Sequence, residues 1–559
     1  MTGDRLLIET ARQGGPWTAG LAVAALTSAG AQLVLPAVVG ATVDAVLTPA
    51  GRPGQWLTLA VALIAVSASA EILTDLATGL STSRATARLR HSLAVHVLAL
   101  DPRAARRHPP GDLVSRLVSQ ASEAAGAGAA LVLAVTALVP PLGSLVALFL
   151  IDPWLGGTFA AGLLVLALVL RTYVIDTADA ATRYQRAQSA IAARLTEALT
   201  GARTISAAGT AGREARRVLQ PLGELGRHGT RTWQAVGLAA AQGVLVAPLL
   251  QIAVIAVAGV ALAGGRLTPG ALVAALQYAA IGAGLGSVVG VLGRIARSRA
   301  GCRRIAEILG APRRHHGETA LPAGPGRLEL RAVTVRRPRT VLDGVSLVVP
   351  GGATIAVVGA SGSGKSTLAA VVGRLLDPDD GEILLDGVPL RDLGREPLRR
   401  AIGHAFARPV LVGETVGSAI ALGFADAGPD RIRAAARTAR IDTVIGRLPH
   451  RYRTRLATTP LSGGEIQRLG LARALAAERL LVLDDATSSL DTVTEHQVSA
   501  ALFDAADRRT RIVITHRAGT AARTDAVAWL EGGRLRGYAP HEVLWADPRY
   551  RELFQGAGR

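Results

Sequence analysis

The chain of 559 residues contains very little cysteine and few aromatic residues. Its single cysteine, Cys302, excludes an intrachain disulfide and any metal site built from several cysteines. Aromatic residues make up 3% of the sequence, which leaves few rings on which nucleic-acid bases could stack. The net charge of +19 alone would favour a nucleic-acid partner. Because the arginines flank apolar segments, the sequence instead predicts no nucleic-acid binding.

Lysine is almost absent as well, since Lys365 is the only one and arginine supplies every other residue of the Lys+Arg total of 61. Lys365 lies in the segment 359–367, GASGSGKST, which matches the phosphate-binding pattern G-x-x-x-x-G-K-[ST]. A compact ammonium fits among phosphate oxygens that backbone N–H groups surround, whereas a planar guanidinium does not. A β-branched run at 353–358 precedes this loop and a helical pattern at 368–376 follows it. The residues predicted to bind a nucleoside triphosphate are Gly359, Ser361, Gly362, Ser363, Gly364, Lys365, Ser366 and Thr367.

Long hydrophobic stretches occupy the first half of the chain. Half of all residues are hydrophobic and the mean hydropathy is +0.34, although the net charge is +19. These properties agree in a membrane protein whose cytoplasmic parts are rich in arginine. Six stretches approach or exceed the ~20 apolar residues that cross a bilayer. They are residues 17–47, 56–80, 124–150, 154–174, 236–263 and 271–295.

The loops between these stretches alternate in length and charge. The three short loops carry at most one arginine each, whereas the long loops after the second and fourth spans carry seven and nine. The positive-inside bias therefore predicts a multi-pass protein of the cytoplasmic membrane, with both long loops and both termini in the cytoplasm. Residues 81–100 and 180–199 keep apolar positions three and four residues apart, which predicts helices that continue beyond the bilayer.

The second half of the chain has a different pattern. Residues 311–326, rich in proline, glycine and charge, are predicted to link an all-α membrane domain of six spans at 1–310 to an α/β domain at 327–559. In the α/β domain, short β-branched runs alternate with helical segments, as in a parallel sheet. One run ends at Asp484, placed to hold Mg²⁺ through water while Ser366 supplies a hydroxyl. Another run ends at His516, which could contact a γ-phosphate or simply pack at the strand end.

Several motifs together resemble the ABC transporters of the exporter type (type IV fold), with fused transmembrane and ATP-binding domains. Residues 461–465, LSGGE, match the family's signature segment, residues 488–491, SSLD, match its D-loop, and His516 its switch histidine. Residues 111–116 and 267–309 resemble its first cytoplasmic loop and its sixth span, so the likeness covers essentially the whole chain. The resemblance implies ATP and Mg²⁺ as cofactors and pairing of two chains, with each ATP between one P-loop and the other signature segment. The residues thereby offered to the partner are Ser462, Gly463, Gly464 and Glu465, and Asp491 belongs to the D-loop.

Three departures from the family pattern fall at the same nucleotide site. Asp485 stands where the family has a glutamate that polarises the attacking water, and a carboxylate displaced by ~1 Å can cost about 10²-fold in rate. Ala407 stands where a glutamine contacts Mg²⁺. Arg337 replaces the aromatic residue that stacks on adenine, although a guanidinium can also stack by its planar face. The resemblance therefore implies ATP binding with weak catalysis by Asp485 and His516.

This combination resembles the weakly hydrolysing half of a heterodimeric ABC exporter. The expected function is ATP-driven transport of a small molecule, peptide or lipid-like substrate across the cytoplasmic membrane, in the export direction. The expected partners are a second, different ABC half-transporter and membrane lipid. Alternatives are a homodimer with two weakened sites, an importer of the siderophore type with an exporter fold, and an ATP-binding regulatory half without turnover of its own. A soluble ABC ATPase is disfavoured by the six apolar stretches.

Overall fold

The chain forms two compact units in a computed structural model that describes residues 3–48, 52–283, 286–424, 428–503 and 508–555. The first unit comprises Met1–Leu100 and His108–Pro312, and the second comprises Asp101–Arg107 and Arg313–Arg559. The short segment Asp101–Arg107 interrupts the first unit in the sequence. Its contacts nevertheless group it with the second unit.

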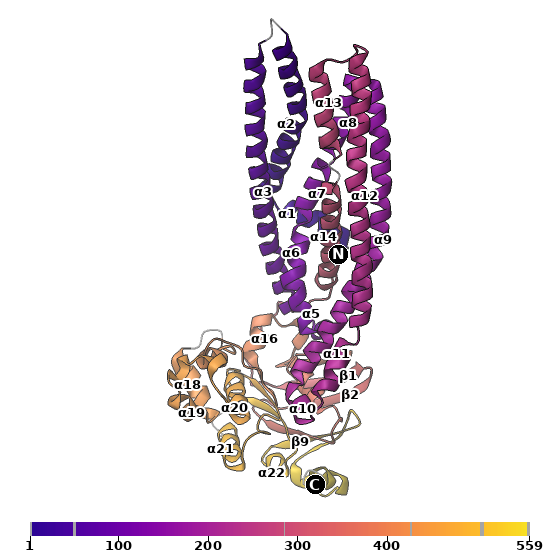
Figure 1. Cartoon of the computed structure of the whole chain (residues 1–559). Helices are drawn as coiled ribbons and strands as arrows, with labels where there is room; N and C mark the ends of the chain where they lie inside the picture. Colours follow the sequence, from indigo (N-terminus) through magenta and orange to yellow (C-terminus); the bar gives the residue numbers. More distant parts are fainter. Residues whose placement is uncertain (1–2, 49–51, 284–285, 425–427, 504–507, 556–559) are drawn as a thin grey trace. The chain divides into compact units, whose positions relative to one another are not determined.

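The first unit is built from helices, the longest of which run side by side (Figure 1). The four longest are α2 (Pro16–Leu47), α3 (Pro53–Leu98), α9 (Pro153–Thr200) and α12 (Leu222–Ala263). The others are α1 (Gly3–Gln13), α5 (Pro110–Ser115), the π-helix η1 (Arg116–Gln120), α6 (Ala121–Ala125), α7 (Ala127–Thr136), α8 (Val139–Ile151), α10 (Ala202–Ala207), α11 (Ala211–Leu219), α13 (Pro269–Gly282) and α14 (Gly286–Leu309). Proline at the first turn starts α2, α3 and α9, because its missing N–H is not needed there.

The predicted spans fall mainly on helical residues, with turns at Gly126, residues 137–138 and Ala283. Within the described part of the chain, three helical stretches are long and apolar enough to cross a membrane, namely Pro16–Leu47, Pro53–Leu98 and Pro110–Ile151. Three shorter apolar stretches are Pro153–Leu168, Pro248–Ala263 and Pro269–Gly282. The count of six spans stays a prediction, and residues 284–285 of the predicted sixth span lie outside the described residues. At 46 residues, α3 is about 70 Å long, more than twice the ~30 Å hydrocarbon core.

A pair of hydrogen bonds joins two helices of the first unit. The Asp44 carboxylate of α2 accepts hydrogen bonds from Thr268 Oγ1 at 2.6 Å and from the Gly270 amide at 2.7 Å. It therefore satisfies one of the free N–H groups at the start of α13, that of Gly270. Gly270 is required there, since a Cβ atom would lie 2.0 Å from the Gly40 carbonyl oxygen. Asp44 thus has a structural role at the end of its span.

The second unit contains two β-sheets. The smaller sheet has the strand order β2-β1-β4-β5 and is antiparallel. The larger has the order β10-β9-β3-β8-β7-β6, with every neighbouring pair parallel except β10 and β9. The strands are β1 (Leu328–Arg337), β2 (Arg339–Val349), β3 (Thr354–Val358), β4 (Asp380–Leu385), β5 (Val388–Pro389), β6 (Ile402–Ala405), β7 (Leu480–Asp484), β8 (Thr510–Ile514), β9 (Ala526–Glu531) and β10 (Arg534–Ala539).

Helices pack around the sheets of the second unit (Figure 1). The α-helices of the second unit are α4 (Pro102–Ala105), α15 (Lys365–Val372), α16 (Arg395–Ala401), α17 (Val416–Ala421), α18 (Pro429–Thr438), α19 (Asp442–Arg447), α20 (Gly463–Ala474), α21 (Thr492–Leu502), α22 (Ala518–Ala521), α23 (His541–Leu544) and α24 (Pro548–Gln555). Short 3₁₀ turns are η2 (Leu390–Asp392), η3 (Arg451–Arg453) and η4 (Leu456–Thr458).

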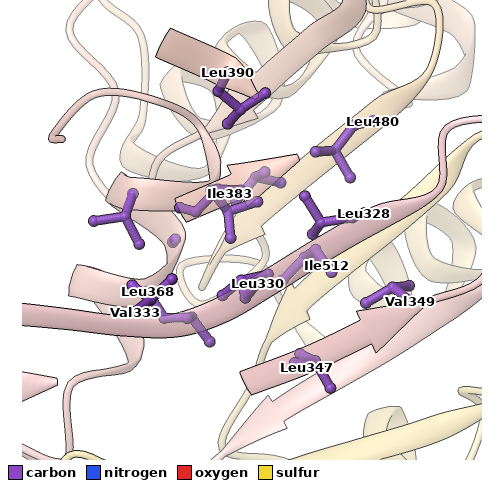
Figure 2. Packing of buried hydrophobic residues seen from close by; sticks show 14 of the residues in the cluster. Leu328, Leu330, Val333, Leu347, Val349, Leu368, Ile383, Leu390, Leu480 and Ile512 are labelled. Atoms are coloured by element: carbon purple, nitrogen blue, oxygen red, sulfur yellow. The ribbon is translucent and has the colours of Figure 1, made fainter. Parts of the chain in front are cut away.

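The main core of the second unit lies between the two sheets. Figure 2 shows Leu328 and Leu330 of β1 together with Leu480 of β7 and Ile512 of β8, all at most 1% exposed. Leu368 of α15 joins the same cluster. Burial of a side chain of this size contributes about 1.5–3 kcal/mol, so this core fixes the sheet firmly. It thereby holds the carboxyl ends of β3, β7 and β8 in place, where the candidate site lies.

Candidate functional site

The glycine-rich loop predicted to bind phosphate connects β3 to α15. β3 is fully buried, and the loop turns back over its carboxyl end. Gly359 has a φ of 153°, and a Cβ atom there would lie 2.2 Å from the Leu530 carbonyl oxygen. Gly364 has a φ of 101° and precedes the first residue of α15. Only glycine adopts these conformations freely, so both positions need it.

The predicted helix after this loop differs from the observed one. The pattern at 368–376 predicted its extent, whereas α15 begins at Lys365 and ends at Val372. It begins earlier because Gly364 in the left-handed region allows the chain to enter the helix directly. It ends earlier because Gly373 follows and Arg374 has a φ of 43°, which a helix cannot contain. The first N–H groups of α15 therefore face the loop, as an anion site requires.

Lys365 lies inside the loop and is 7% exposed. Its Nζ donates to the carbonyl oxygens of Gly359 at 2.7 Å and Ala360 at 2.9 Å. An ammonium has three hydrogens, so one donor remains for a phosphate oxygen. Burial lowers the pKa of Lys365, while the carboxylates of Asp485 and Asp484 act in the opposite direction.

Ser366 and Asp484 lie in contact. The Ser366 hydroxyl donates to Asp484 Oδ1 at 3.2 Å, and Asp484 is the last residue of β7. Burial raises the pKa of Asp484, the Ser366 hydrogen bond lowers it, and Asp485 raises it further. A divalent cation would offset that cost, and a hydroxyl with a carboxylate are the hard oxygen ligands that Mg²⁺ prefers. Phosphate and water oxygens would supply the other ligands, as is usual for Mg²⁺.

Asp485 and His516 lie at neighbouring strand ends. The distance from His516 Nε2 to Asp485 Oδ2 is 3.8 Å. Asp485 has a φ of 47°, in the left-handed region that aspartate tolerates better than most residues. Its carbonyl oxygen accepts hydrogen bonds from the Ser488 amide at 3.1 Å and from Gln467 Nε2 at 3.0 Å. These two hydrogen bonds fix the backbone of Asp485.

Two further departures lie at other edges of this region. Ala407 follows β6, and its carbonyl oxygen accepts a hydrogen bond from Gln467 Nε2 at 3.2 Å. Its methyl side chain offers no polar atom. Arg337 ends β1. Burial lowers the pKa of Arg337, and the nearby guanidinium groups of Arg106 and Arg103 lower it further.

The signature segment forms the capped start of α20. Ser462 Oγ accepts a hydrogen bond from the Glu465 amide at 3.4 Å, and the Ser462 amide donates to Glu465 Oε2 at 2.7 Å. This reciprocal capping box uses Glu465 within the chain. Its pattern, S-x-x-E, is visible in the sequence, although the family resemblance implied for Glu465 only a role toward the partner chain. A Cβ atom at Gly463 would meet nothing within 4 Å, and one at Gly464 would lie 3.2 Å from the Ser489 carbonyl oxygen.

The remaining loop residues occupy well-defined positions. Asp491 caps the start of α21, because its carboxylate accepts a hydrogen bond from the Thr494 amide at 2.9 Å. This contact lowers the pKa of Asp491. Ser363 is buried. Gln467 follows the signature segment as in the family, but its contacts and the pair Arg103–Asp379 were not predicted, since they join residues distant in the chain.

These features define a membrane protein with a helical transmembrane region and an α/β ATPase domain of the P-loop class. Comparison with known proteins specifies the family. A family model described as "ABC transporter transmembrane region" matches residues 19–283, and one described as "ABC transporter" matches residues 342–488. The ABC transporter ATP-binding protein RamA of Streptomyces coelicolor is 47% identical over 543 residues, which cover 96% of this chain and 84% of that protein. The chain therefore belongs to the ABC transporter family.

Other similar proteins differ in what their names describe. An ATP-dependent lipid A-core flippase of Chromobacterium violaceum is 42% identical over 234 residues, 41% of this chain and 40% of that protein. The mycobactin import ATP-binding/permease protein IrtA of Mycolicibacterium smegmatis is 45% identical over 222 residues, 39% of this chain and 26% of that protein. The solved structure of a bacterial Atm1-family ABC exporter with ATP bound is similar, with a TM-score of 0.79 and 26% sequence identity. The match covers 97% of this chain and 98% of the exporter chain. The chain is thus an ATP-driven, multi-pass membrane transporter with exporter-type architecture and a cytoplasmic ATPase domain.

Proposed function

We propose that this chain is one half of a heterodimeric exporter, and that its own P-loop site binds Mg-ATP but hydrolyses it slowly. The observation that carries the proposal is the contrast between two parts of one site. The phosphate-binding parts are complete, with Lys365 inside the loop and Ser366 beside Asp484. The parts that activate water are changed, at Asp485 and Ala407.

The chemistry of the site follows from these residues. Lys365 and the first amides of α15 would bind the phosphates of ATP, and Ser366 with Asp484 would hold Mg²⁺, which would neutralise phosphate charge. Asp485 is the base nearest to His516, and its carboxylate is one methylene shorter than the glutamate expected there. At 3.8 Å from His516, the carboxylate orients the imidazole loosely, since a hydrogen bond needs a distance near 3 Å. Binding is therefore retained while activation of water is weak.

The partner's site would use the start of α20. Ser462, capped by Glu465, and the unhindered Gly463 present N–H groups at the positive end of the helix dipole. This surface has none of the changes found at the P-loop site. The pairing therefore assigns the faster ATP site to the partner's P-loop and this chain's signature segment.

Transport of a small molecule, peptide or lipid-like substrate in the export direction is the corresponding proposal for the membrane unit. The exporter architecture over 97% of the chain supports it. Import of a siderophore-like molecule is the alternative, and the similarity of 39% of this chain to a mycobactin import protein supports it. The deciding measurement is uptake or release of labelled substrates by inside-out vesicles that contain the complete pair.

An ATPase assay tests the division of labour. The purified full-length chain should bind Mg-ATP yet release phosphate very slowly, and addition of its partner half-transporter should raise the rate by at least about 10²-fold. A brisk rate from the chain alone would show that the substitutions at 485 and 407 are neutral and would support a homodimer. Binding without stimulation by any half-transporter would support a regulatory subunit.

A further inference from the structure

Gln467 connects several loops of the nucleotide site through one side chain. It lies in the second turn of α20 and is 1% exposed. Its Nε2 atom is 3.2 Å from the Ala407 carbonyl oxygen, 3.0 Å from the Asp485 carbonyl oxygen and 3.2 Å from Ser488 Oγ. Its Oε1 atom accepts a hydrogen bond from the Ser489 amide at 2.9 Å. The four contacts reach the segment after β6, the end of β7 and the D-loop.

The number of hydrogens on the amide limits these contacts. The Ser489 N–H bonded to Oε1 fixes which end of the Gln467 amide is oxygen, so the three acceptors face the nitrogen. A carboxamide nitrogen carries two hydrogens and therefore makes two linear hydrogen bonds at once. Three acceptors within 3.2 Å thus compete for two donors. A small displacement of one loop can exchange one contact for another without leaving the buried nitrogen unpaired.

The position of Gln467 joins two different ATP sites. Asp485, whose carbonyl oxygen it contacts, belongs to the P-loop site of this chain. Ser462, five residues earlier and at the start of the same helix, belongs to the site that this chain completes for its partner. A shift of the Asp485 backbone would change the hydrogen bonds of Gln467, and α20 is a rigid element that carries such a change to its first turn.

The substitution at 407 increases the importance of this contact. The family's glutamine at this position is replaced by alanine, so the segment after β6 cannot contact the site through that side chain. The Gln467 amide instead holds the backbone of Ala407 at 3.2 Å. Gln467 therefore contacts two of the three positions that depart from the family pattern, Ala407 and Asp485.

We propose that Gln467 is a positioning residue that transmits ATP binding at this chain's P-loop to its signature segment, and so regulates the partner's site. The inference rests on the proposed function, because it requires ATP at this P-loop and a second site at Ser462. It concerns communication within one chain, which can be measured without turnover and without the partner.

Hydrogen exchange measured by mass spectrometry on the full-length chain in nanodiscs tests the proposal. In the wild type, saturating Mg-ATP should slow amide exchange both at 359–367 and at 462–466. Gln467→Met removes all four contacts, and Gln467→Glu keeps an acceptor for the Ser489 amide while removing both donors. Both variants should retain the slowing at 359–367, and the slowing at 462–466 should fall at least about fivefold, the lower end of ordinary coupling between sites.

Arg468→Met is the matched control. Arg468 neighbours Gln467 on α20 and donates to the Arg440 carbonyl oxygen, away from the D-loop. It should behave as the wild type. Slowing at 462–466 that persists in the Gln467 variants, as direct contact with a second copy would produce, would overturn the proposal. So would loss at 359–367 in both variants, absence of slowing at 462–466 in the wild type, or an equal loss in Arg468→Met. None of these outcomes alters the ATPase rates that test the proposed function.

Discussion

At the scale of single residues, Lys365 shows how composition can identify a site. In a chain that otherwise uses arginine for its basic residues, one lysine remains where two loop carbonyls and a phosphate must share an ammonium. Lys365→Ala should abolish nucleotide binding, and Lys365→Arg should reduce it severely because the guanidinium exceeds the space inside the loop. Photolabelling with an azido-ATP analogue measures both. Labelling of either variant at the wild-type level would contradict the assignment.

Asp485 is expected to affect the rate of hydrolysis through its backbone conformation as well as through its carboxylate. A misplaced carboxylate can cost about 10²-fold in rate. Asp485→Glu in the isolated chain should recover only part of this loss and raise the rate of phosphate release about tenfold. Recovery is partial because glutamate fits a φ of 47° less well than aspartate, and because Ala407 remains. The double variant with Ala407→Gln should be faster than either single variant. Equal rates for the wild type, the two single variants and the double variant would show that neither position affects catalysis.

His404 in β6 predicts a dependence of stability on pH. Burial lowers its pKa to about 4, with a smaller contribution from Arg399, and among the described residues neither ring nitrogen has a hydrogen-bond partner. The unfolded chain, with a pKa near 6.5, binds the proton first as the pH falls. Stability is therefore full above about pH 6.5 and decreases by up to about 3 kcal/mol as the pH falls towards 4.

The corresponding variant is His404→Phe, which can pack beside Phe406, whose ring centroid lies 4.4 Å from that of His404. It should flatten the decrease in thermal stability of the ATPase domain between pH 7 and pH 5. The neutral folded imidazole makes little difference at pH 7, so the two proteins should unfold at similar temperatures there. An unchanged slope in the variant would assign the pH dependence to other groups.

At the scale of elements, α4 shows how a very short helix can be anchored. It has four residues, too few to be stable alone. Arg103 donates to Asp379 Oδ1 at 2.7 Å and to the Asp377 carbonyl oxygen at 2.8 Å. The other oxygen of Asp379 accepts the Arg336 amide at 2.7 Å, directly before Arg337.

Arg103→Ala should therefore release the segment 101–107. The side chain of Arg103 is 41% exposed, so the ion pair contributes about 1 kcal/mol at most, and amide exchange in this segment should accelerate roughly fivefold. Arg107→Ala changes the same charge at an exposed position of the same segment and is the control. Equal acceleration in both variants would mean that net charge, and not the contact, holds α4.

Local patterns in the sequence predicted much of this structure, and long-range contacts account for what they missed. The glycine loop, the strand that ends at Asp484 and the long helices follow from short motifs and periodicity. The end of the P-loop helix did not, because a left-handed Arg374 stops it without proline. The contacts of Gln467 could not be predicted, since they join it to four groups between 18 and 60 residues away. Its place after the signature segment was visible, but its burial was not.

At the scale of the whole molecule, the proposed pair predicts unequal damage from two substitutions in this chain. Ser462 starts the helix that would complete the partner's faster site, whereas Asp485 would belong to the slow site. Ser462→Arg should stop ATP turnover of the reconstituted pair, because it removes the capping oxygen and places a bulky cation where a γ-phosphate binds. Asp485→Asn should reduce turnover by less than about tenfold, since it removes the base of a site that would contribute little to turnover.

The measurement is the ATPase rate of the pair, with photolabelling of both chains to show that nucleotide still binds. A Ser462→Ala variant separates the loss of the cap from the added bulk, and it should retain part of the activity because Gly463 and Gly464 still offer their amides. If Asp485→Asn stopped turnover while Ser462→Arg were tolerated, this chain would own the working site. The partner would then carry the slow one, and the division of labour between the two chains would be reversed.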